Sequence, residues 1–211
     1  MELLHDLLTS YLERHTDPEP DLAALVNRET HLKETRPHML SGHYQGRLLS
    51  LISKLVAPKC VLEIGTFTGY ATLCMAEGLV KGGIIHTIDI DDERAERVSA
   101  YFKQSPYATN IRYHIGDAVE VIPTLTESFD LVFIDADKQN NQRYYDLVID
   151  RVQAGGVILI DNVLWKGKVL TPAGDKQTAA IVALNEYIAA DQRVEKLILP
   201  IRDGLFFIRK L

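Results

Sequence analysis

Residues 60–70 read CVLEIGTFTGY, and this stretch indicates where the fold begins. A short apolar run ends at Glu63 and Gly65, after which the chain turns and resumes as a helix-like run. A strand, a glycine turn and a helix in this order open the α/β folds that bind nucleotides. We therefore expect residues 60–64 to form a buried strand whose carboxyl end lies at a binding site.

Strand-like and helix-like runs alternate after this stretch. The strand-like runs cover residues 82–90, 111–117, 129–137 and 155–163, and a loop through Gly167, Pro172 and Gly174 leads to a last helix at about 176–190. Such alternation predicts an α/β fold, with a parallel sheet covered by helices on both faces. The final runs, VEKLILPI and GLFFIRKL, have too short a connection for a parallel crossover, so we expect an antiparallel edge hairpin.

The N-terminal part is predicted to be helical. Apolar residues recur at helical spacing over residues 3–14, 21–33 and 44–56, and the third run places Leu48, Leu49, Ile52 and Leu55 on one face. Asp21 is expected to cap the second of these helices, and Asp91 a later one. Because no linker or repeat interrupts the chain, we expect one domain over residues 1–211. Residues 1–56 would be a helical cap and residues 57–211 the core.

The composition is that of an ordinary globular protein, with 211 residues, 46% hydrophobic and 25% charged. The net charge of -6 disfavours a nucleic-acid or membrane partner held by electrostatics. No apolar run approaches the roughly 18 residues of a membrane span, and the acidic N-terminus does not resemble a signal peptide. Cys60 and Cys74 are expected to be buried thiols in a reducing compartment. We therefore expect a cytoplasmic protein.

Acidic residues follow five consecutive predicted strands. They are Glu63, Asp89, Asp117, Asp135 with Asp137, and Asp161. An isolated acid after a strand is most often a helix cap. Ligands of open α/β sheets, however, bind outside the carboxyl ends of the strands. Five acids on one rim therefore indicate a functional site.

The glycine turn argues against a dinucleotide. A G-x-G-x-x-G site needs glycine where this chain has Phe67 and Tyr70, because backbone amides must approach a pyrophosphate. Asp89 suits a ribose diol, and acids near the turn suit a cofactor with positive charge and no phosphate. S-adenosylmethionine is such a cofactor. A dehydrogenase that uses NAD is an alternative by fold analogy, against which these two aromatic residues argue.

Asp135, Asp161 and Asn162 offer two carboxylates and one amide oxygen at neighbouring strand ends. Such hard oxygen ligands are typical of Mg²⁺ or Ca²⁺ sites. The spacing is equally compatible with a plain turn at residues 161–162. Lys138 follows Asp135 by three residues. A lysine beside a metal and a sulfonium loses its proton readily, as a base must, but a solvated lysine is the simpler alternative.

Four ordered motifs resemble the cation-dependent class I O-methyltransferases, the caffeoyl-CoA/catechol O-methyltransferase family, and most closely its small bacterial members. They are LEIGTFTGY, FDLVFIDADKQN, GGVILIDNVLWKGKV and LPIRDGLFFIRK, and the resemblance runs from about Met39 to the C-terminus. It implies a Rossmann-like class I methyltransferase fold with a seven-stranded, mostly parallel sheet. It also implies a homodimer that methylates an oxygen atom with S-adenosylmethionine.

The resemblance further implies individual roles. Asp135, Asp161 and Asn162 would hold Mg²⁺, or else Ca²⁺ or Mn²⁺. Lys138 would be the base that works beside Asp135 on the acceptor, and Trp165 would line the acceptor pocket. The cofactor would be held by a larger set: Met39, Ser41, Glu63, Gly65, Thr66, Ala71, Asp89, Asp117, Ala118 and Asp135.

Three departures from the family pattern bear on these roles. Ala71 stands where the family often has a serine whose hydroxyl contacts the cofactor. Phe206 stands where the animal catechol enzymes have an acid near the acceptor. No basic insertion resembles the segments that hold coenzyme A in the plant enzymes. We therefore expect a catechol-like acceptor, a vicinal dihydroxy aromatic, rather than a coenzyme A thioester.

Two alternatives concern the substrate and the activity. Some bacterial members methylate a hydroxylated wobble uridine of tRNA, and a basic patch at the mouth of the site would favour that substrate. The residues that could form it are Arg36, Arg47, Arg143, Lys166 and Lys168. A binding module without catalysis is disfavoured because the three metal-ligand candidates and Lys138 occur together.

Overall fold

The computed structural model describes residues 2–171 and 175–211, so Pro172 and Gly174 of the predicted loop lie outside the described residues. Within these ranges, seven strands form one sheet in the order β3-β2-β1-β4-β5-β7-β6. The strands are β1 (Cys60–Ile64), β2 (Ile84–Asp89), β3 (Ile111–Ile115), β4 (Phe129–Ile134), β5 (Val152–Asp161), β6 (Val194–Leu199) and β7 (Leu205–Lys210). Strands β1 to β5 are parallel, and β7 is antiparallel to both β5 and β6. The predicted fold class and edge hairpin are confirmed.

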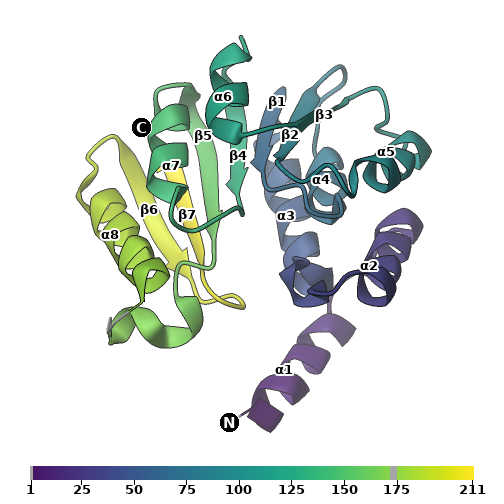
Figure 1. Cartoon of the computed structure of the whole chain (residues 1–211), viewed down its shortest axis with the longest axis horizontal. Helices are drawn as coiled ribbons and strands as arrows, with labels where there is room; N and C mark the ends of the chain where they lie inside the picture. The colour runs from purple at the N-terminus through teal and green to yellow at the C-terminus, as the bar shows by residue number, and fades with distance from the viewer. Residues whose placement is uncertain (1, 172–174) are drawn as a thin grey trace.

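Helices cover both faces of the sheet (Figure 1). They are α1 (Glu2–Arg14), α2 (Asp21–Lys33), α3 (Gly42–Val56), α4 (Tyr70–Ala76), α5 (Ala95–Gln104), α6 (Ala118–Val121), α7 (Asn141–Ile149) and α8 (Lys176–Ala190). Short 3₁₀ turns lie at Pro37–Met39 (η1), Ile122–Thr124 (η2) and Trp165–Leu170 (η3). Among the described residues, no helix has the length and apolar character needed to cross a membrane.

Strand β1 is almost entirely apolar because both of its faces are buried. Val61 packs into the cluster that joins the sheet to α2–α5, while its neighbour Leu62 packs into the cluster under α6–α8. Both side chains are fully buried. A parallel strand covered on both faces has no solvent side, so apolar residues follow one another without alternation. Cys60 and Cys74 are buried free thiols, as expected.

Two predicted helix caps are wrong. Asp21 is the first residue of α2 and Pro20 precedes it, so Asp21 serves as an acid in the first turn. Helix α5 begins only at Ala95, because Asp91 accepts a hydrogen bond from the Glu93 amide and pairs with Arg94 in a turn of its own. Local hydrogen bonds of this kind compete with helix initiation.

The N-terminal helices differ in how they are covered. Helix α2 packs on α4 and α5, and α3 packs on α4. Helix α1 extends away from the rest of the molecule in Figure 1 and contacts α3. On α3, Leu49 and Ile52 are buried, whereas Leu55, predicted on the same face, is 86% exposed. Leu55 therefore faces away from the core, whereas Val56 at the end of α3 packs against it.

Candidate active site

The predicted cofactor turn and the predicted metal site meet at the carboxyl ends of β1 and β4. The sheet order changes direction between these two strands, which is where open α/β sheets bind ligands. The Asp135 amide donates to Ile64 O at 2.9 Å, and a Cβ on Gly65 would lie 2.1 Å from Asp135 O. With its φ of +101°, Gly65 is required both for the turn and for this close approach.

Two carboxylates and a lysine lie together at the ends of β4 and β5. Lys138 Nζ donates to Asp135 Oδ1 at 3.0 Å, and only 9% of the lysine side chain is exposed. Asp161 is 2% exposed, and burial together with the nearby charge of Asp135 raises the pKa of Asp161 to about 6. The sequence left open whether Lys138 is an ordinary solvated lysine, and the structure excludes that.

Asn162 adjoins this pair in an unusual backbone conformation. Its φ is +63°, and its amide donates to Asp161 Oδ1 at 2.7 Å. Phe67, Trp165, Lys166 and Arg202 also have positive φ. These residues occupy the segments that follow β1 and β5 and the β6–β7 turn. Strained backbone gathered around one rim is typical of functional sites, where it holds side chains in set positions.

The donor chemistry of this pair fits a divalent cation. Each oxygen of Asp161 accepts one hydrogen bond, Oδ2 from Gln45 and Oδ1 from the Asn162 amide, which leaves a lone pair on each. The mutual repulsion of Asp135 and Asp161 is the condition that a positive ion relieves. Within the described ranges no three His, Cys, Asp or Glu side chains cluster as metal ligands. The expected set accordingly relies on the amide of Asn162 as its third donor.

Asp89 and Asp117 both bind backbone amides. Asp89 Oδ2 accepts from the Phe67 amide at 2.6 Å and so holds the glycine turn against the end of β2. Asp117 Oδ1 accepts from the Val119 amide at 2.8 Å and caps α6, which begins at the buried Ala118. The structure thus gives each acid a structural task, alongside the predicted contact with the cofactor.

Glu63 lies beneath the turn rather than on its surface. Its carboxyl is fully buried, and Oε2 accepts from the hydroxyls of Thr72 and Thr87, the latter at 2.5 Å. Thr87 Oγ1 lies 2.6 Å from Thr66 Oγ1, so a chain of hydroxyls connects the acid to the turn. Burial raises the pKa of Glu63 to about 8, and Oε1 has no hydrogen-bond partner within the described residues. A contact between Glu63 and the cofactor stays a prediction.

The structure also shows the surroundings of Ala71 and Phe206, two of the three departures from the family pattern. Ala71 is buried; the nearby hydroxyls of Thr66 and Thr72 bind Thr87 and Glu63, and that of Thr68 accepts a hydrogen bond from Thr30. Phe206 is buried on β7 in the cluster under α6–α8 and lies in the core.

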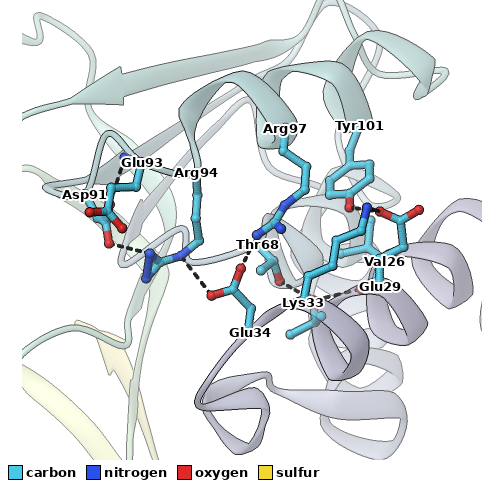
Figure 2. Close-up of polar contacts among 11 residues, drawn as sticks. Val26, Glu29, Lys33, Glu34, Thr68, Asp91, Glu93, Arg94, Arg97 and Tyr101 are labelled. Carbon is cyan, nitrogen blue, oxygen red and sulfur yellow. Dashed lines mark hydrogen bonds and ion pairs between the residues drawn. The ribbon is translucent and has the colours of Figure 1, made fainter.

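Met39 and Ser41 lie on residues 34–41, a segment that we name the strap. It leaves the end of α2, passes through η1 and enters α3. Met39 is 48% exposed and Ser41 is buried. At its start, Glu34 pairs with Arg94 and Arg97 of the α5 region, which Figure 2 shows on either side of the carboxylate. The strap is therefore tied to the segment that follows β2 and Asp89.

The sequence and structure of this chain match known methyltransferases. Residues 13–211 match the family described as O-methyltransferase. The chain belongs to this family. Caffeoyl-CoA O-methyltransferase 1 of Eucalyptus globulus is 33% identical over 219 residues, which cover 98% of this chain and 87% of the plant protein. The resemblance drawn from the four motifs is confirmed.

Solved structures extend the match to the whole fold of this O-methyltransferase. The S-adenosylhomocysteine-bound methyltransferase of Podospora anserina superposes with a TM-score of 0.92 at 25% identity and covers 100% of this chain and 96% of its own. An O-methyltransferase of Bacillus cereus, also in complex with S-adenosylhomocysteine, gives a TM-score of 0.89 at 26% identity and covers 97% of each chain.

The basic patch that would favour tRNA does not form as one exposed surface in this O-methyltransferase. Arg47 is buried and pairs with Glu77 at 2.5 Å. Lys168 pairs with Asp175 at 3.6 Å, while Arg36, Arg143 and Lys166 are exposed. A buried, paired arginine cannot contact phosphates, so the structure does not favour the tRNA alternative over a small acceptor.

Two residues at the site of this O-methyltransferase were not predicted. Gln45 reaches Asp161, and Arg202 reaches the strap. A signal for Gln45 existed, because it precedes Leu49 and Ile52 by four and seven residues and so lies on the apolar stripe of α3. Arg202 sits in a short turn, where a charged residue is ordinary.

Proposed function

We propose that this enzyme transfers a methyl group from S-adenosylmethionine to one hydroxyl oxygen of a catechol-like acceptor, with the help of a divalent cation. One observation carries the proposal: Asp135 at the glycine turn lies near Asp161 of the neighbouring strand and is paired with a buried lysine. We take residues 1–211 as a single methyltransferase domain with residues 1–56 as a helical cap, since α2 and α3 pack on α4 and α5.

The glycine turn and the strap form the proposed cofactor site. Gly65 and Thr66 approach the methionine part from the turn, and Met39 and Ser41 approach from the strap. Asp89, Asp117 with Ala118, and Ala71 complete the set around the ribose, the adenine and the start of α4. The bound S-adenosylhomocysteine of the Podospora and Bacillus relatives supports this cofactor.

The carboxylates and the lysine form the proposed catalytic centre. Asp135, Asp161 and Asn162 would hold the cation, with Mg²⁺ preferred by these oxygen donors. When bound, the cation favours the ionised form of an acceptor hydroxyl, and S-adenosylmethionine supplies the methyl group. In its neutral form, Lys138 would accept the hydroxyl proton at Nζ, and Asp135 would orient that amine. Trp165 borders the acceptor. The rate enhancement comes mainly from holding the acceptor oxygen in line with the methyl group.

Loss of either metal-binding carboxylate tests this centre. We expect Asp135→Ala and Asp161→Ala each to lower turnover by about 100-fold or more, because each removes a charged cation ligand. Turnover is measured by methyl transfer to catechols with Mg²⁺ and with excess chelator. Asp137→Ala is the matched control, since this neighbouring acid binds Tyr144 and Asn140 instead. Full activity of either variant, or of the enzyme in chelator, would contradict the metal assignment.

The same assay decides the acceptor. A panel of vicinal diphenols, their monophenol counterparts, a coenzyme A thioester and hydroxylated tRNA is offered with S-adenosylmethionine and Mg²⁺. We expect methylation of the free diphenols and not of the monophenols, because two adjacent oxygens are needed to bind the cation. The thioester should not be methylated, because no basic insertion resembles the segments that hold coenzyme A in the plant enzymes. Transfer to tRNA alone would overturn the small-molecule acceptor while leaving the methyltransferase activity intact.

We also propose a homodimer, as the family resemblance implies. Exposed apolar side chains gather on the exposed faces of two helices: Leu7, Leu8 and Tyr11 on α1, and Leu51 and Leu55 on α3. Helices α1 and α3 contact each other, so these side chains belong to adjoining elements. Exposed apolar area of this kind is typical of association surfaces.

A further inference from the structure

The β6–β7 turn contacts two segments that are far apart in the sequence. Arg202 donates from Nη1 to Ser41 O of the strap and from Nη2 to His38 O at 3.3 Å. Asp203 accepts from the amides of Leu164 and Lys166, on either side of Trp165. The turn therefore lies between the proposed cofactor segment and the proposed acceptor segment.

Gln45 continues these contacts into the catalytic centre. It is fully buried on α3, its Nε2 donates to Asp161 Oδ2 at 2.8 Å, and its Oε1 faces Arg202 Nη1 at 3.5 Å. A carboxylate accepts only from the amide nitrogen and a guanidinium donates only to the amide oxygen. The two charged partners therefore impose a single orientation on the Gln45 amide.

We propose that Gln45 and Arg202 are positioning residues that couple the strap to Asp161, so that binding of the cofactor organises the cation site. The inference rests on the proposed function, in which the strap contacts the cofactor and Asp161 holds the cation. An ordered strap keeps Ser41 O and His38 O in place for Arg202, and Arg202 keeps the Gln45 amide directed at Asp161 Oδ2.

Positioning of this kind should raise the affinity for the cation. Without it, the cation itself would have to order the flexible side chain of Asp161 when it binds. Outer hydrogen bonds to metal ligands contribute measurably to metal affinity. Coupling between two sites is reciprocal, so the cation should tighten cofactor binding by the same factor. Neither Gln45 nor Arg202 needs to touch the cofactor, the cation or the acceptor.

The test measures binding rather than turnover. The dissociation constant for Mn²⁺, followed by the electron paramagnetic resonance of the free ion, is determined with and without S-adenosylhomocysteine. We expect the cofactor product to tighten Mn²⁺ binding about fivefold or more in the unaltered enzyme. In Gln45→Leu and in Arg202→Gln this ratio should fall toward one. Arg209→Gln is the matched control, because Arg209 lies on the same hairpin and pairs with Glu195.

Hydrogen exchange separates the two positioning residues. Arg202→Gln should speed exchange of the strap amides, since the contacts to Ser41 O and His38 O are lost. Gln45→Leu should leave that exchange unchanged and still abolish the coupling. If Gln45→Leu does not fold, Arg202→Gln in its surface turn tests the proposal alone.

Two further outcomes overturn the inference in distinguishable ways. Variants that keep the ratio of the unaltered enzyme, or an unaltered enzyme whose ratio is one, disprove the coupling while the cation site stands. An enzyme that binds S-adenosylhomocysteine but no Mn²⁺ disproves the proposed cation site, and the coupling with it.

Discussion

The sequence predicted the position of Glu63 correctly but did not predict the environment of its carboxyl group. The sequence places an acid at the end of β1, where a cationic cofactor would approach. In the structure Thr72 and Thr87 enclose the carboxyl, and Oε1 lacks a partner within the described part of the chain. A buried carboxyl with only hydroxyl donors is more stable protonated.

This environment makes the stability of the enzyme depend on pH. Folding raises the pKa of Glu63 from 4.5 to about 8, so between these values the folded state keeps a proton that the unfolded state loses. The free energy of unfolding should therefore fall as pH rises from about 4.5 to about 8. We expect Glu63→Gln, which cannot ionise, to weaken this decline in urea unfolding curves. Glu186→Gln on the exposed face of α8 is the control, and an unchanged decline in Glu63→Gln would contradict the assignment.

At the scale of elements, the contact between α2 and α5 fixes the start of the strap. Figure 2 shows two of its contacts: Glu34 lies between Arg94 and Arg97, and Glu29 binds Lys33 and Tyr101. In a third contact, Thr30 donates to Thr68. The last joins α2 to the glycine turn at 2.9 Å. Cap and core are thus joined beside the proposed cofactor site.

Removing the carboxylate of Glu34 tests this contact. Its side chain is 12% exposed, between the surface and buried cases, so Glu34→Gln should lower the free energy of unfolding by about 1–2 kcal/mol. The variant should also bind S-adenosylhomocysteine more weakly, since the strap loses its first anchor. Urea unfolding and calorimetry measure the two effects, with Glu13→Gln on α1 as the control. A stability loss with unchanged cofactor affinity would show that the α2–α5 contact stabilises the fold but does not position the strap for the cofactor.

At the scale of the whole molecule, the described residues leave an apolar surface on α1 and α3 uncovered. Leu55 is 86% exposed and follows the exposed Leu51 by four residues on α3, on a face distinct from that of the buried Leu49 and Ile52. A second copy of the chain would cover this surface and explain why α3 carries leucines on its exposed face.

A charge at this surface should break the proposed dimer. We expect Leu55→Glu to halve the molecular mass in sedimentation velocity and to leave the fold intact, because an exposed side chain contributes little to the core. Leu32→Glu on α2, where the leucine is 75% exposed, should leave the mass unchanged. A monomeric unaltered enzyme would disprove the homodimer, and a Leu55→Glu variant that stays dimeric would place the interface elsewhere.

Much of this protein follows from the sequence by itself. Periodicity and turn chemistry act between near neighbours in the chain, so the helices, the strands and the antiparallel hairpin around Arg202 are predictable. The motif residues Gly65, Asp135 and Asp161 follow in the same way, because the ends of parallel strands share one edge of the sheet.

Only the tertiary structure decided what surrounds these residues. Gln45 lies 116 positions from Asp161, and Arg202 lies 161 positions from Ser41. Such contacts depend on how α3 and the β6–β7 turn cross the sheet edge, which local spacing does not encode. The same holds for the burial of Glu63 and Lys138, because burial is a property of the neighbours that packing brings, and not of the residue.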